Sequence, residues 1–140
     1  MAEGDGTIYN KFKVRILNKE LDLDTDTLKL GLLGAGYTPN IDTDLVWSDV
    51  NGTEESGGGY TAGGLAVTGG ALTLVSASDL AKFDADNVIF SGLDVGTPSY
   101  AVLYDTSASN ALIAYWELNT ASNAGDFTIA WNANGIITIT

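Results

Sequence analysis

Most of the chain consists of short apolar segments separated by residues that favour turns. In the first of them, Leu28, Leu30 and Leu32 alternate with Lys29 and Gly31, which is the pattern of a strand with one buried face. We expect about nine such strands, at residues 28–32, 65–67, 71–75, 81–83, 87–91, 100–104, 111–118, 127–131 and 136–140. Closely spaced short strands without helices between them indicate a mainly β protein, an antiparallel β-sandwich or barrel.

Two turn signals suggest how some of these strands connect. Gly69-Gly70 lies between two apolar segments and predicts a hairpin that joins residues 65–67 to residues 71–75. Asn132-Ala-Asn-Gly135 predicts a turn between the last two strands.

One N-terminal α-helix is predicted ahead of the strands, from Thr7 to Asn18. Asp5 or Thr7 can cap its start, and Asn18 can end it. The apolar positions form one stripe and are Ile8, Tyr9, Phe12, Ile16 and Leu17. A helix of about three turns is not stable alone, so we expect it to pack on the sheet. Residues 1–6 are predicted to be a flexible N-terminal segment, and residues 7–140 a single β-rich domain.

Composition narrows the classes of function. The chain has no cysteine and no histidine, which excludes disulfides, thiolate zinc sites and nucleophile–histidine pairs. Its net charge is −12, and Lys82 is the only basic residue after Lys29. We therefore expect no cofactor, no nucleic-acid partner and no binding to anionic membranes, since both of those surfaces attract basic proteins. The first residues also lack the pattern of a signal peptide.

The acidic residues include one candidate metal cluster, formed by Asp22, Asp24 and Asp26. Calcium favours several carboxylate oxygens close together, and this spacing begins like an EF-hand loop. The pattern then fails, because Thr27 stands where the loop needs glycine and Leu33 where it needs glutamate. The favoured interpretation is a solvated acidic turn or edge strand, with a calcium site as the alternative. A hydrolase that uses only carboxylates is a further alternative, and its candidate acids are Glu54, Glu55, Asp84 and Asp86.

The three tryptophans raise the alternative of a glycan-binding surface. Trp116 and Trp131 lie within apolar strand patterns, so core packing is the favoured interpretation for both. Trp47 lies in a loop-rich stretch and is expected to be the exposed aromatic residue, and therefore the candidate glycan contact.

Six stretches span nearly the whole chain in order: MAEGDGTIYNKFK (1–13), GYTPNIDT (36–43), GYTAGG (59–64), KFDADNV (82–88), ALIAYWEL (111–118) and DFTIAW (126–131). Together they resemble a family of small structural proteins encoded by tailed bacteriophages. The resemblance implies a non-enzymatic virion protein, similar to a capsid decoration or cement protein that binds and stabilises the assembled shell. It would be assembled in the bacterial host cytoplasm and lie on the virion surface.

The resemblance also implies the partners, which would be other virion proteins, above all the major capsid protein, with a homo-oligomer also open. The alternative role is a virion adhesin, or a tail or head-fibre component, that binds host surface glycans. We expect docking at the N-terminal end, where the flexible segment adjoins a basic cluster in an otherwise acidic chain. The candidate partner-binding residues are Ala2, Glu3, Gly4, Asp5, Gly6, Lys11, Lys13 and Arg15.

Overall fold

The computed structural model describes residues 6–140, and the protein is mainly β, as the sequence predicts. The strands are β1 (Thr7–Ile8), β2 (Leu28–Leu33), β3 (Leu65–Ala66), β4 (Ala71–Val75), β5 (Leu80–Asp84), β6 (Val88–Leu93), β7 (Tyr100–Asp105), β8 (Ala111–Glu117), β9 (Gly125–Ile129) and β10 (Ile137–Ile139). The helices are α1 (Asn10–Leu17) and α2 (Trp47–Val50), with 3-10 turns at Asn51–Thr53 and Ser76–Ser78.

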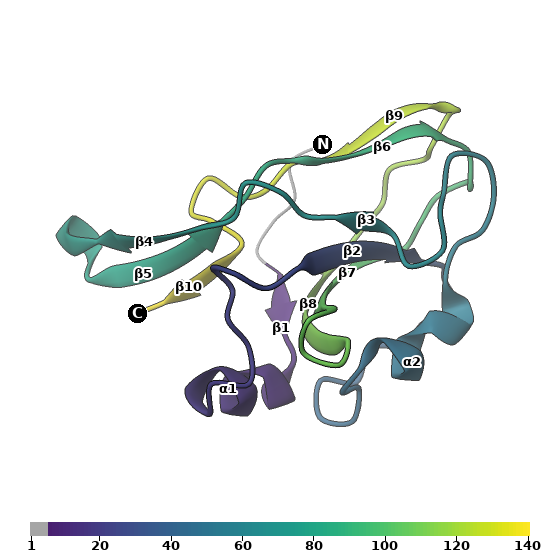
Figure 1. Cartoon of the computed structure of the whole chain (residues 1–140). Coiled ribbons are helices and arrows are strands. Elements are labelled where there is room, and N and C mark those ends of the chain that lie inside the picture. The colour runs from purple at the N-terminus through teal and green to yellow at the C-terminus, as the bar shows by residue number, and fades with distance from the viewer. Residues whose placement is uncertain (1–5) are drawn as a thin grey trace.

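The strands form three antiparallel sheets in a sandwich-like arrangement (Figure 1). The central sheet has the strand order β1-β8-β7-β2-β3. The pair β6–β9 packs against this sheet across the larger apolar core. The third sheet, with the order β10-β5-β4, extends sideways from the rest of the protein in Figure 1. We call this third sheet the projecting sheet.

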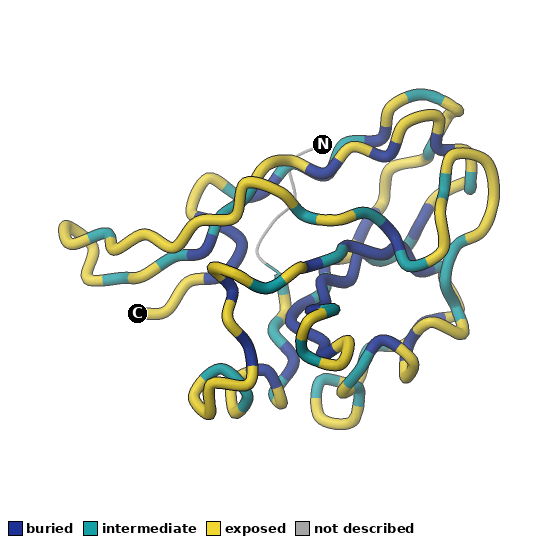
Figure 2. Tube along the Cα trace, in the orientation of Figure 1, coloured by how far each residue is buried: buried dark blue, intermediate teal, exposed yellow. Residues whose placement is uncertain are grey.

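Two apolar cores lie against the central sheet, because side chains of a strand alternate between its faces. Leu30 and Leu32 of β2 enter the larger core, where they are joined by Phe90 of β6. Val102 of β7 and Leu112 of β8 enter the smaller core with residues of α2. Figure 2 shows that the buried segments gather in the central sheet, whereas much of the projecting sheet is exposed.

The N-terminal helix is shorter than predicted and begins at Asn10. Thr7 and Ile8 instead form β1, which pairs with β8. Tyr9 is fully buried and has an extended backbone, so the helix cannot begin before it. Thr7 is therefore not the cap, and Asp5 lies outside the described residues. The residue at the end of the helix is Asn18, as predicted.

The apolar stripe of the helix is only partly confirmed. Phe12 is 3% exposed and lies in the larger core. Ile16 is partly buried and packs against the same core. Leu17 was expected beside this stripe, but its side chain is 87% exposed. The packed face of this helix is narrower than the sequence predicts, because α1 contributes little more than one turn of side chains to the core.

The predicted hairpin at Gly69-Gly70 is wrong. β3 pairs with β2 in the central sheet, whereas β4 pairs with β5 in the projecting sheet. The two glycines therefore mark the corner at which the chain leaves one sheet for another. Gly69 has a φ of 68°, and a Cβ atom there would collide with the carboxylate of Asp86. The predicted turn at Asn132–Gly135 is confirmed, with a hydrogen bond of 2.9 Å from the Gly135 N–H to the Asn132 carbonyl.

Candidate interaction surface

The projecting sheet has one apolar face that the rest of the protein covers only in part. We define this apolar face by Leu72, Leu74, Ala81, Phe83, Ile137 and Ile139, which the pairing registers place in two rows on one side of the sheet. Phe83 and Ile137 belong to the larger core and are buried. Leu72, Leu74 and Ile139 are 56%, 73% and 61% exposed. The apolar face is therefore an extension of the core that lacks a cover at its outer end.

A groove of about 570 Å³ lies between the apolar face and the segment that follows α1. Leu72, Leu74 and Ile139 line it from the sheet, and Leu21 and Leu23 line it from the opposite side. A contiguous apolar surface of this kind marks an interaction site more often than a chance exposure does. Full burial of one such side chain contributes about 1.5–3 kcal/mol, so a partner that covers several of them gains substantial affinity.

The sequence predicts the β4 strand but not its exposure. Its alternation, Ala71-Leu-Thr-Leu-Val75, places both leucines on one face. Alternation cannot tell whether another element covers that face. One further signal was present, because residues 56–78 contain no charged side chain in a chain of net charge −12.

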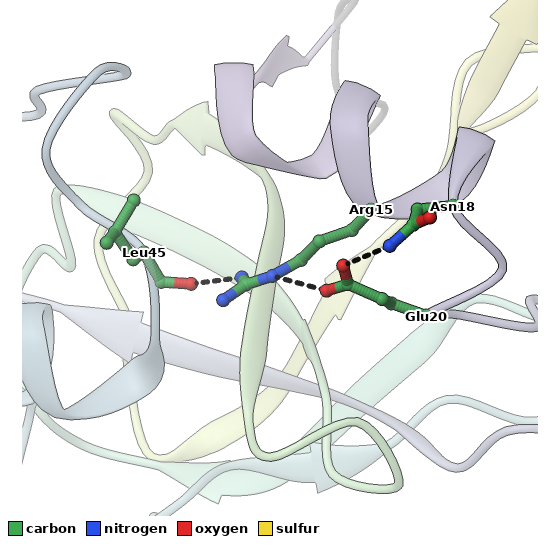
Figure 3. A network of polar contacts seen from close by, with 4 residues as sticks. All are labelled: Arg15, Asn18, Glu20 and Leu45. Carbon is green, nitrogen blue, oxygen red and sulfur yellow. Dashed lines mark hydrogen bonds and ion pairs between the residues drawn. The ribbon is translucent and has the colours of Figure 1, made fainter.

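Arg15, one of the predicted docking residues, is occupied within the protein (Figure 3). Its Nη1 donates a hydrogen bond of 2.7 Å to the carbonyl of Leu45, and its Nε lies 3.5 Å from Oε2 of Glu20. The amide of Asn18 donates to the other oxygen of Glu20. The Arg15 side chain is only 14% exposed. It therefore joins α1 to the loop before α2, and little of its side chain is exposed to a partner.

The other predicted docking residues divide into three groups. Lys11 and Lys13 are exposed on α1, and Lys13 donates a hydrogen bond to the side chain of Asn10. Gly6 packs against the indole of Trp116 so closely that a Cβ atom would overlap the ring. Ala2, Glu3, Gly4 and Asp5 lie outside the described residues. The lysines therefore remain available to a partner.

Trp47, the predicted glycan contact, is buried, so this prediction is wrong. Its side chain is 7% exposed and stacks on Tyr104, with ring centroids 4.4 Å apart and an interplanar angle of 11°. The indole also lies against Gly31, where a Cβ atom would overlap it. A glycine inside a strand often marks such a close approach, and this was the signal that the sequence offered. Trp116 and Trp131 are core residues, as predicted.

The candidate metal ligands Asp22, Asp24 and Asp26 form a turn stabilised by their own side chains. Oδ1 of Asp22 accepts a hydrogen bond from the Asp24 N–H, and Oδ2 of Asp26 accepts one from the Asp22 N–H. These carboxylates thus bind backbone donors, in the manner of turn-forming aspartates. Among residues 6–140 no group of three or more acidic side chains is arranged to hold a metal ion.

Asp105, at the end of β7, is a fully buried carboxyl group that the sequence did not single out. Its Oδ1 accepts hydrogen bonds from the N–H groups of Ser107 and Ala108. Its Oδ2 is buried without a donor among the described residues. The carboxyl group of Asp105 also interacts with that of Asp26. Burial, followed by the interaction with Asp26, raises the pKa of Asp105 from 3.8 to about 7. The raised pKa favours the protonated form of Asp105, which can donate a hydrogen bond to Asp26.

Three of the acids considered for hydrolysis accept hydrogen bonds from nearby backbone and side-chain groups. Oε1 of Glu54 accepts hydrogen bonds from the Tyr60 hydroxyl and the Gly63 N–H, and so fixes the glycine-rich loop. Oδ2 of Asp86 accepts a hydrogen bond from Thr68, and Oδ1 of Asp84 accepts one from the N–H of the next residue. Burial raises the pKa of Glu55.

No protein-family model, curated protein sequence or solved structure matches the chain. None of the helices in the described part of the chain is long and apolar enough to span a membrane. The choice of a candidate functional surface therefore rests on the structure of this chain. The principal candidate is the apolar face with its groove.

Proposed function

We propose that this chain is a non-enzymatic structural protein of a tailed-phage virion, which binds the assembled capsid shell through the apolar face of the projecting sheet. The observation that carries the proposal is the exposure of Leu72, Leu74 and Ile139 beside an apolar groove. The resemblance of the sequence to tailed-phage structural proteins supports the choice of the capsid subunit as the occupant.

Charge supports the same orientation. Residues 56–78, which include β4, carry no charge, while most of the remaining chain is acidic. Approach of this face to a partner buries few charged groups, and those in the groove lining are Lys19 and Asp22. The exposed Lys11 and Lys13 are additional contacts for an acidic region of that partner. A protein that binds only assembled shells stabilises the shell by mass action, and this requires no chemical reaction.

Capsid particles stripped of this protein provide the test. Leu72 and Leu74 are both replaced by serine, and occupancy of re-added protein on the particles is measured by gel densitometry. We expect occupancy at limiting concentration to fall by about tenfold or more, equivalent to about 1.4 kcal/mol. The variant must melt like the unmodified protein, because the replaced side chains are already exposed.

Leu17→Ser is the matched control, since Leu17 is equally apolar and 87% exposed but lies on α1. We expect it to leave occupancy unchanged. Equal binding of the Leu72/Leu74 variant, or failure of the unmodified protein to bind shells, would contradict the proposal. Cryo-electron microscopy of the particles then distinguishes the capsid from a tail or fibre position.

A further inference from the structure

The outer edge of β4 is open. The projecting sheet has the order β10-β5-β4, so β4 uses one edge to pair with β5 and, within residues 6–140, pairs with nothing on its other edge. An open edge presents backbone N–H and C=O groups that can bind another strand. This edge also adjoins the exposed Leu72 and Leu74.

The β4 edge lacks the features by which proteins usually prevent edge pairing. Such features are charged side chains, proline, bulges or a covering element. Ala71–Val75 contains no charged residue and no proline, and its register with β5 has no bulge. The neighbouring strand β5 does carry charges, at Lys82 and Asp84. A chain of net charge −12 thus leaves an uncharged strand at the edge of a protruding sheet.

We propose that β4 pairs antiparallel with β4 of a second copy of this chain. A two-fold axis at Thr73 places Thr73 opposite Thr73, Leu72 opposite Leu74, and Ala71 opposite Val75. This register pairs all five residues of the strand. Since side chains alternate, it also keeps the leucines of both copies on the same side of a continuous six-stranded sheet. Leucine pairs and a threonine pair directly opposite each other are favourable across antiparallel strands.

The charge distribution favours contact between two copies at this edge over contact elsewhere on their surfaces. Two copies of net charge −12 repel each other over most of their surfaces. Contact through the uncharged β4 edges of two projecting sheets keeps the acidic bodies apart. Added salt screens the remaining repulsion, so dimerisation is expected to strengthen with ionic strength.

This inference goes beyond the proposed role on the capsid and does not depend on it. Edge pairing uses backbone groups in the plane of the sheet and leaves the apolar face uncovered. The two copies together present one apolar face that extends across both projecting sheets.

Sedimentation velocity of the whole protein across a concentration series tests the pairing. We expect a species of twice the 14.6 kDa monomer mass. Thr73→Glu places two carboxylates opposite each other at the two-fold axis, and we expect it to raise the dimer Kd by about tenfold or more, or about 1.4 kcal/mol.

Thr138→Glu is the matched control. Thr138 of β10 and Thr73 are both exposed and both opposite Lys82 of β5, but they lie on opposite edges of the sheet. The new glutamate therefore has the same basic neighbour in each variant. We expect Thr138→Glu to dimerise like the unmodified protein. A monomer at every concentration, or equal effects of the two substitutions, would overturn the proposal.

A cysteine at position 73 tests the register directly, because the natural chain has no cysteine. Residues opposite each other in antiparallel strands have Cα atoms about 4.5–5.5 Å apart, which a disulfide can span. Thr73→Cys should therefore form a covalent dimer on mild oxidation, and Thr138→Cys should not. Cross-linking of Thr138→Cys alone would assign the interface to β10 and refute pairing through β4.

Discussion

The buried carboxyl of Asp105 makes the stability of this protein depend on pH in a particular direction. Its pKa is about 7 in the folded protein, against an ordinary value of 3.8. Between these two values the folded protein holds a proton that the unfolded chain has released. Folding is therefore most favoured by this group at low pH, and the contribution is lost as the pH rises through about 7. Each pKa unit corresponds to about 1.36 kcal/mol, so the upper limit of the effect is about 4 kcal/mol.

Asp105→Asn isolates this contribution. The amide oxygen can still accept hydrogen bonds from Ser107 and Ala108, and the amide NH₂ can donate to Asp26 at every pH. We expect Asp105→Asn and the unmodified protein to have similar free energies of unfolding near pH 4. At pH 8 we expect the variant to be more stable by about 2–4 kcal/mol, since it avoids a buried negative charge.

Urea denaturation at a series of pH values measures this difference. Asp126→Asn is the control, because it removes one negative charge from an exposed position and so reports the general effect of net charge. A difference between Asp105→Asn and the unmodified protein that is constant with pH would refute the reasoning. So would an equal pH-dependent gain in Asp126→Asn.

Three further predictions concern the helix, the acidic turn and the N-terminal segment. Phe12→Ala should lower the free energy of unfolding by about 3–5 kcal/mol in denaturant titrations, and Leu17→Ala by less than about 0.5 kcal/mol, because only Phe12 is buried. EDTA or excess calcium should shift the melting temperature by less than about 5 °C, because the Asp22–Asp26 carboxylates bind backbone donors; a larger shift would reveal a calcium site. Removal of residues 2–5, which retains Gly6 against the core, should lower occupancy on stripped capsid particles by about tenfold, and unchanged occupancy would refute a docking role for this segment.

The fold class and most strand positions could be predicted from the sequence, because alternation and turn residues are local signals. Strand partners could not. Gly69-Gly70 has the composition of a hairpin turn, yet β3 and β4 belong to different sheets. The choice depends on which distant strands offer an apolar surface, and no local pattern contains that information. The N-terminal boundary of α1 was missed for a related reason, since pairing of Thr7 and Ile8 with β8 overrides their place in a helical pattern.

The candidate site was harder to predict than the fold. Trp47 was expected to be exposed because its neighbours are loop formers, but the indole covers Gly31 of a strand distant in sequence. Arg15 was expected to face a partner because it belongs to a basic cluster, but it binds the Leu45 carbonyl. Conversely, the sequence predicts a strand at residues 71–75 but does not show that Leu72 and Leu74 are exposed. In each case exposure is set by tertiary packing, which residue type alone does not determine.

The strand pairings described above also have a consequence for the order of folding. The β4–β5 hairpin joins neighbouring residues and can close within about 1–10 μs, whereas β1 must find β8, and Ile8 pairs with Ala114. Sheets with such distant pairings fold in about milliseconds to seconds. During that interval the hairpin exposes its leucines and its open edge before the central sheet is complete. We expect formation of the central sheet to limit the rate of refolding. We also expect association during refolding to increase with protein concentration, because the β4–β5 hairpin has already formed and exposes its edge.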